Sequence, residues 1–184
     1  MPPPLLVTFA AGASGTWRIE RINTVIGADL PAAERLAVLE GSQAQAPTDS
    51  NWILRGVTSN TRYTNRPELD ALVASQQGLL RPQATRAALI PIRKTETWWA
   101  LAQDERRAIF EEQSSHIGVG LEYIPAVARR LHHSRELGEA FDFVTWFEYA
   151  PEHSEAFEEL VRRLRETQEW RYVDREVDVR LTRI

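Results

Sequence analysis

Apolar and polar side chains alternate with a period of two over several stretches of this chain, which is the pattern of a half-buried β-strand. The alternation is strictest in 172–182, where valine and leucine alternate with charged and hydroxyl side chains. It is almost as clear in 141–149, where aromatic side chains and Thr145 share one face. The strands predicted from such patterns are 5–10, 16–26, 52–63, 87–92, 141–149 and 172–182.

A period of 3.6 residues predicts helices between these strands. The best example is 152–167, where four apolar residues from Phe157 to Leu164 fall on one stripe. Its acidic residues come early and its arginines late, as the helix dipole favours. Three more helices are expected at 67–77, opened by Pro67, at 97–113, capped by Thr97, and at 116–124, after which Pro125 should break the chain.

The order of elements in the second half, β-α-α-β-α-β, predicts helices on one face of a mainly antiparallel sheet. This is a ferredoxin-like α+β arrangement. The first half reads as a shortened companion, β-β-β-α, with a linker-like stretch at 41–51. We therefore predict a single domain over 1–184, made of a shortened half (1–84) and a second half (85–184).

Composition excludes several classes of function. With 43% hydrophobic and 26% charged residues the chain reads as an ordinary soluble globular protein. The absence of cysteine removes disulfides, zinc–thiolate sites, iron–sulfur clusters and cysteine nucleophiles. No apolar run approaches the roughly 20 residues that span a bilayer, and no signal peptide is visible, which predicts a cytoplasmic protein. The net charge of −4, with arginine pairs scattered among acids, argues against nucleic-acid binding.

Histidines are the candidate metal ligands. His116 lies on a predicted inward stripe, where a histidine satisfied within the core is the commoner outcome. Gly118 and Gly120 follow it at a combined cost of roughly 2 kcal/mol relative to alanine. A flat group approaching the backbone would explain that cost, and so would a helix end. His132 and His133 would diverge on a helix, so we expect one to be partly buried and the other exposed.

The remaining signals are weak. His153 is expected to be exposed near a helix start, no zinc-binding H-x-x-x-H spacing occurs, and no G-x-S-x-G hydrolase elbow occurs. Trp98, Trp99 and Trp146 are typical core residues but could also wall an aromatic cofactor. One histidine beside glycines with aromatic walls fits a haem pocket, although composition alone does not decide for it.

Taken together, these segments resemble the chlorite dismutase family of haem proteins. The resemblance covers most of the chain and is strongest from Arg86 to Arg183. It rests on the runs ALIPIRK ending at Lys94, WW at 98–99, SSH ending at His116, ARRLHHS at 128–134, DFVTWFE at 142–148 and EWRYV from Glu169. The chain resembles the short, dimeric branch of the family, whose N-terminal half is trimmed, so the resemblance implies a homodimer of the dimeric α+β barrel type.

The resemblance also implies a haem b cofactor bound in the second half of the chain. His116 matches the axial ligand of the iron, and Glu169 matches the acid that accepts a hydrogen bond from its other ring nitrogen. Arg129 matches the distal arginine. The other matched positions are Leu131, Thr145 and Phe147 in the distal pocket, and Lys94 and Trp99 near the haem edge.

The implied activity is the conversion of chlorite to chloride and dioxygen. An oxygen–chlorine bond breaks at ferric haem, and the hypochlorite-level fragment then recombines with the transferred oxygen to form the O–O bond. The permanent charge of Arg129 suits an anionic substrate and fragment. The alternatives are a coproporphyrin-haem decarboxylase-like protein, which Arg129 disfavours, a non-catalytic haem-binding or sensing protein, and a monooxygenase without haem. No membrane partner is expected.

Overall fold

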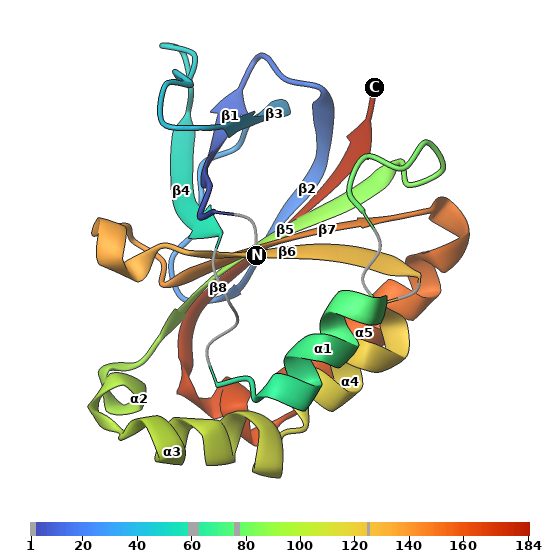
Figure 1. The fold of residues 1–184 in the computed structure, drawn as a ribbon. Coiled ribbons are helices and arrows are strands. Elements are labelled where there is room, and N and C mark those ends of the chain that lie inside the picture. The colour runs from blue at the N-terminus through green and yellow to red at the C-terminus, as the bar shows by residue number, and fades with distance from the viewer. Residues whose placement is uncertain (1–2, 59–62, 76–77, 125) are drawn as a thin grey trace.

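The computed structural model describes residues 3–58, 63–75, 78–124 and 126–184. Its strands are β1 (Leu6–Gly12), β2 (Trp17–Ile26), β3 (Arg35–Glu40), β4 (Trp52–Thr58), β5 (Arg86–Lys94), β6 (Val127–His133), β7 (Phe143–Tyr149) and β8 (Val173–Arg183). Within the described residues these eight antiparallel strands close into a barrel in the order β1-β3-β2-β8-β5-β7-β6-β4 (Figure 1). The chain is therefore a mixed α/β protein built around a barrel.

The α-helices lie on one side of the barrel, away from β1 and β3, and the turn between β6 and β7 lies apart from them beside β4 (Figure 1). The helices are α1 (Arg66–Ser75), α2 (Glu96–Ala100), α3 (Gln103–Arg107), the π-helix η1 (Ala108–Gln113), α4 (His116–Tyr123), α5 (Ser154–Arg165) and the short 3-10 turns η2 (Arg135–Leu137), η3 (Pro151–His153) and η4 (Gln168–Tyr172). In the described part of the chain, no helix is long and apolar enough to cross a membrane. The cytoplasmic location stays a prediction.

Apolar side chains fill the interior of the barrel. Trp146 is fully buried there and contacts Phe9 and Trp17, with ring centroids 5.9 and 5.1 Å apart. The outer face of β5, β6 and β7 is mostly apolar as well, and α5 covers it with Phe157, Leu160, Val161 and Leu164. The same three strands therefore separate two apolar layers, one inside the barrel and one beneath the helices.

Most predicted elements are present, with shifted ends. The amphipathic helix 152–167 is confirmed as η3 and α5, and the alternating runs 141–149 and 172–182 are confirmed as β7 and β8. The predicted strand 52–63 ends at Thr58 in the described residues. Residues 59–62, the predicted end of the first helix at 76–77, and the predicted break at Pro125 lie outside the described residues.

The prediction of one helix over 97–113 is wrong. Thr95, and not Thr97, caps α2, because its hydroxyl accepts the N–H of Trp98 at 3.3 Å. The chain then leaves the helix at Leu101, restarts as α3, and widens into the π-helix η1. Strand β3 was also not predicted, because its six residues carry an apolar run and no alternation.

Strand β6 corrects the helical placement of the histidine pair. His132 and His133 lie on this strand, and both are buried, with 0% and 6% of their surface exposed. The expectation that one of them is exposed is therefore wrong. The strand was missed because polar side chains stand on both of its faces, so it shows no alternation of apolar and polar positions.

Candidate functional site

A large cavity lies between the outer face of β5, β6 and β7 and the helices that cover it. Its open space, counted together with the solvent at its mouth, is about 1200 Å³. Most of its wall is aliphatic or aromatic, with Ile90, Ile117, Phe147 and Leu164 as examples. The ionisable side chains in the wall are Tyr63, Lys94, His116, Arg129, His133, Arg165, Glu169 and Glu176. Such a cavity suits a bulky, mostly apolar ligand with a few polar contacts.

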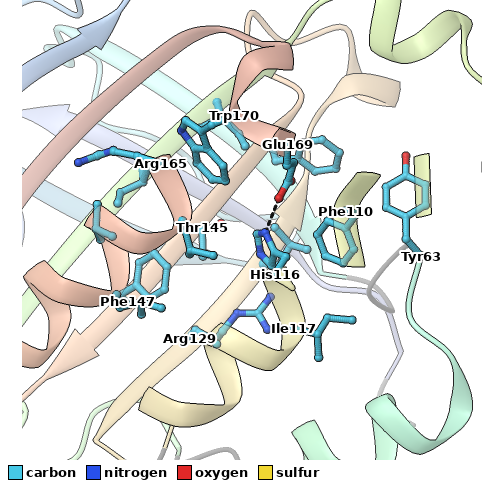
Figure 2. Close-up of a pocket in the computed structure, with 18 of the residues that line it drawn as sticks. Tyr63, Phe110, His116, Ile117, Arg129, Thr145, Phe147, Arg165, Glu169 and Trp170 are labelled. Carbon is cyan, nitrogen blue, oxygen red and sulfur yellow. Dashed lines mark hydrogen bonds and ion pairs between the residues drawn. The ribbon is translucent and has the colours of Figure 1, made fainter. Parts of the chain in front are cut away.

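One wall of the cavity is set by the register between β6 and β7. Arg129 pairs with Phe147 and Leu131 pairs with Thr145, so all four side chains point to the same face of the sheet. All four line the cavity, and Figure 2 shows Arg129, Thr145 and Phe147 in it. The four residues predicted for the distal side are thus brought together by strand geometry.

Arg129 brings a positive charge into this apolar wall. Desolvation in the cavity lowers the pKa of its guanidinium from the usual value. A guanidinium nevertheless stays charged in proteins at any physiological pH. Because charges interact more strongly away from bulk water, the cavity favours a small anion beside Arg129.

Another part of the cavity wall carries a hydrogen-bonded line of three side chains. His116 is the first residue of α4, and its Nδ1 lies 2.6 Å from Oε2 of Glu169 in η4 (Figure 2). The other carboxylate oxygen of Glu169 accepts a hydrogen bond from Nζ of Lys94 at 2.7 Å. A carboxylate in this position fixes the orientation and tautomer of the imidazole and makes its other nitrogen a stronger donor.

Glu169 is ionised although it is buried, with 3% of its surface exposed. Burial alone would raise the pKa of its carboxyl, but the His116 imidazole and the Lys94 ammonium together lower that pKa to about 2. Lys94 is itself 4% exposed, and its Nζ lies 4.2 Å from the centre of the Trp98 ring. The carboxylate that faces the imidazole is therefore negatively charged, and the Lys94 ammonium lies on its other side.

The imidazole of His116 is held between aromatic rings. Phe110 stacks on it with ring centroids 4.4 Å apart, and Trp170 lies nearly parallel at 6.2 Å. Since Nδ1 bonds to Glu169, the opposite nitrogen, Nε2, is the one available to a ligand in the cavity. At Gly120, also in the cavity wall, an added Cβ would meet no atom within 4 Å, so a side chain there would occupy open space. These residues fit a flat metal macrocycle held through one imidazole.

The two residues predicted near the haem edge lie in different places. Lys94 lines the cavity but stands behind Glu169. Trp99 lies outside the cavity wall, stacked on Phe143 at 5.9 Å, and its indole N–H donates to Asp142 at 3.1 Å. Their roles at a haem edge stay predictions.

The remaining histidines belong to other surroundings. His132 lies inside the barrel, where its Nδ1 is 2.8 Å from the carbonyl oxygen of Val144 and its Nε2 accepts from Nε of Arg130 at 3.0 Å. Burial lowers the pKa of His132 to about 4, so it is neutral at pH 7. His153 is partly exposed, with 42% of its side chain in solvent, and His133 packs edge-on to an aromatic ring in the cavity wall.

Several residues of the site were not assigned a role from the sequence. Phe110 and Trp170 pack against the imidazole, and the Oγ of Ser114 accepts the backbone N–H of Glu169 at 2.9 Å. The indole of Trp170 also donates to Glu176 at 2.7 Å. The position of Trp170 directly after Glu169 was a usable signal, whereas the placement of Phe110 depends on a π-helix that no sequence pattern announces.

Comparisons with known proteins agree with this geometry. A chlorite dismutase from Ideonella dechloratans is 33% identical over 97 residues, which are 52% of this chain and only 33% of that protein's length. The crystal structure of dimeric chlorite dismutases from Nitrobacter winogradskyi is 56% identical and matches with a TM-score of 0.88 over 96% of this chain and 99% of that one. A mutant chlorite dismutase from Candidatus Nitrospira defluvii, in complex with cyanide, is 21% identical and shares the fold, with a TM-score of 0.71 over 98% and 91% of the two chains.

The family model for chlorite dismutase matches residues 29–184, which is most of the chain. This match includes the strands, helices and side chains that build the cavity. The protein therefore belongs to the chlorite dismutase family.

Proposed function

We propose that the protein is a haem b enzyme that converts chlorite to chloride and dioxygen. The observation that carries this proposal is the pairing, in one apolar cavity, of a carboxylate-bonded imidazole with a permanent cation. Family membership and the 56% identity to dimeric chlorite dismutases over nearly the whole chain support the same activity.

His116 would hold the haem iron through Nε2. Its Nδ1 donates to Glu169, and Lys94 fixes the carboxylate from the other side, so the ring cannot turn freely. The ionised Glu169 gives the imidazole partial imidazolate character, which makes it a stronger electron donor. When bound, the haem supplies the redox-active iron at which the oxygen–chlorine bond of chlorite breaks.

Arg129 would bind the anions of the reaction. Its charge attracts chlorite into the cavity, and it then retains the hypochlorite-level fragment until the O–O bond forms. Leu131 and Phe147 exclude water beside Arg129, which strengthens this attraction. Thr145 places a hydroxyl group on the same wall. Retention protects the chain, because escaping hypochlorite would oxidise it.

The assembly is proposed to be a homodimer of chains that each contain two ferredoxin-like halves, 1–84 and 85–184. The strand order in the barrel supports the two halves. The strands of the first half lie in the order β4-β1-β3-β2 and those of the second half in the order β8-β5-β7-β6. In each half this is the fourth, first, third and second strand along the chain. The dimeric state of the relative from Nitrobacter winogradskyi supports the dimer. Light scattering of the haem-loaded protein should give twice the 21.0 kDa mass of the chain, and a monomer at micromolar concentration would contradict the dimer.

The activity is tested by adding chlorite to the haem-loaded protein in an oxygen electrode. One dioxygen and one chloride should appear for each chlorite consumed, with chloride measured by ion chromatography. A protein that shows a Soret band but releases no oxygen would be a haem-binding module. Conversion of iron coproporphyrin to haem b in the presence of peroxide, without oxygen release from chlorite, would support the decarboxylase instead.

A further inference from the structure

The backbone immediately before His116 has an uncommon shape. The π-helix η1 ends at Gln113, and Ser115 then adopts a left-handed conformation with φ of 51°. A π-helix is rare, and a non-glycine residue at positive φ costs energy; both tend to occur at functional sites. A side chain that stabilises this turn would therefore help to fix the position of α4 and of its first residue, His116.

Glu111 spans the turn with both its backbone and its side chain. Its carbonyl oxygen accepts the N–H groups of Ser114 and Ser115, the latter at 2.8 Å. Its carboxylate reaches over to α4, where Oε2 accepts the N–H of Ile117 at 2.7 Å and Oε1 the N–H of Gly118 at 3.3 Å. The first N–H groups of a helix have no partner inside it, and the positive end of the helix dipole favours a negative charge there.

The same turn contacts the other parts of the imidazole's surroundings. Phe110, directly before Glu111, stacks on the His116 ring at 4.4 Å. Ser114, three residues after Glu111, accepts the backbone N–H of Glu169 at 2.9 Å. A displacement of this turn would therefore move the imidazole, the ring packed on it and the carboxylate bonded to it relative to one another.

We propose that Glu111 is a positioning residue for His116: its carboxylate fixes the start of α4 and thereby the plane and direction of the imidazole. The inference rests on the proposed ligation of haem by His116. Glu111 itself lies one step away from the ligand and acts only through the helix start. Two substitutions separate its reach from its charge, because Glu111→Gln keeps an oxygen acceptor of the same length and Glu111→Ala keeps neither.

The first measurement does not depend on haem. Hydrogen exchange of the purified full-length chain should show the amides of Ile117 and Gly118 exchanging at least tenfold faster in Glu111→Ala than in the wild type. Glu112→Ala is the matched control, because Glu112 is the exposed acidic neighbour on the same π-helix, and it should leave these amides unchanged. Equal exchange in Glu111→Ala and the wild type would overturn the capping role.

The second measurement concerns the ligand itself. Transfer of haem to an excess of apomyoglobin should be about 10–100-fold faster from Glu111→Ala, the usual effect of losing a group that orients a metal ligand, and intermediate from Glu111→Gln. The rhombic splitting of the ferric EPR signal should change in both variants. If the folded Glu111→Gln and Glu111→Ala proteins keep the wild-type transfer rate and EPR signal, Glu111 does not position His116.

The two proposals fail in different ways. A His116→Ala protein that keeps the wild-type Soret band would refute ligation by His116, while the exchange of the Ile117 and Gly118 amides would still report on Glu111. If Glu111→Ala does not fold, Glu111→Gln carries the test, because it retains one hydrogen bond to the helix start. Faster haem transfer from Glu112→Ala as well would overturn the assignment to Glu111 and indicate a general weakening of η1.

Discussion

The barrel interior and the cavity on its outer face each hold a histidine, a carboxylate and aromatic rings, but the hydrogen bonds of the two histidines differ. Inside the barrel, His132 uses both ring nitrogens within the chain, one toward the carbonyl oxygen of Val144 and one toward Arg130. In the cavity, His116 uses one nitrogen for Glu169, which leaves the other for a ligand. The histidine of the interior therefore has both nitrogens bonded within the chain, whereas the histidine of the cavity keeps one nitrogen for a ligand.

Alternation along β6 and β7 assigns side chains to these two regions. Arg129 and Phe147 face the cavity, whereas Arg130 and Trp146, each one position away and paired with each other, face the barrel. A slip of one residue in the pairing would exchange the two sets. Adjacent residues of the same type therefore make matched pairs for testing which region a function belongs to.

The largest effect is expected from the two histidines. His116→Ala should lose the haem or bind it without its native ligation, because it removes the imidazole that Glu169 orients toward the cavity. His132→Ala should keep a normal Soret band but lose about 2–3 kcal/mol of unfolding free energy, since it leaves buried partners unpaired. Absorption spectra and denaturant titrations of both variants measure the contrast. Native ligation retained in His116→Ala would sink the assignment.

Acid should act on the barrel through His132. Burial lowers the pKa of His132 to about 4, whereas an unfolded histidine titrates near 6.5. The unfolded chain therefore binds the extra proton first, and stability should fall as the pH drops from about 6.5 to about 4, by about 3 kcal/mol from this residue. Denaturant titrations across this range should show a flatter pH dependence for His132→Gln.

Sequence patterns predicted the fold wherever one face of an element is apolar and the other polar. The strand β8 and the helix α5 satisfy this condition, and both were predicted at nearly their observed bounds. Strand β6 does not satisfy it, because Arg129 faces the cavity while Arg130 and His132 face the barrel. Because polar residues stand on both faces of β6, the strand shows no alternation from which it could have been predicted.

The residues of the candidate site were predicted from the sequence only in part. The resemblance to a known family supplied His116, Glu169 and Arg129, and all three line the observed cavity. The contact between Lys94 and Glu169 joins the end of β5 to η4, 75 residues apart in the chain. No local pattern encodes such a contact, because it depends on how the barrel closes.

A smaller effect is expected from the carboxylate behind the ligand. Glu169→Gln removes the negative charge that the His116 imidazole and Lys94 share, so the bound haem should have a higher ferric/ferrous reduction potential and be retained about 10–100-fold less tightly. Glu148→Gln is the matched change inside the barrel, where that carboxylate accepts from the Trp146 indole at 2.9 Å. It should leave the potential unchanged. Spectroelectrochemistry measures the reduction potential of both variants. If Glu169→Gln had the same potential as Glu148→Gln, this result would count against the pairing of His116 with Glu169.

The smallest change in haem binding, and the most specific change in chemistry, is expected from Arg129. Arg129→Ala should keep the Soret band, because Arg129 comes from β6, whereas the proposed ligand His116 and its partner Glu169 come from α4 and η4. Turnover of chlorite should fall by about tenfold, the equivalent of roughly 1.4 kcal/mol. It should persist in part, because the breaking of the oxygen–chlorine bond is chemistry that the haem would supply without this side chain. Without the cation more hypochlorite should escape, and the enzyme should bleach after fewer turnovers.

The neighbouring arginine provides the control that completes this comparison. Arg130 lies one residue away but on the barrel side, where it bonds to His132 at 3.0 Å and to Glu40 at 2.7 Å. Arg130→Ala should therefore lower the unfolding free energy and leave oxygen yield, hypochlorite escape and lifetime unchanged. An oxygen electrode and a chlorination trap measure the first two quantities for both variants. If Arg129→Ala matched the wild type in all three, Arg129 would not act on the anions, and alternation along β6 would no longer separate a catalytic face from a structural one.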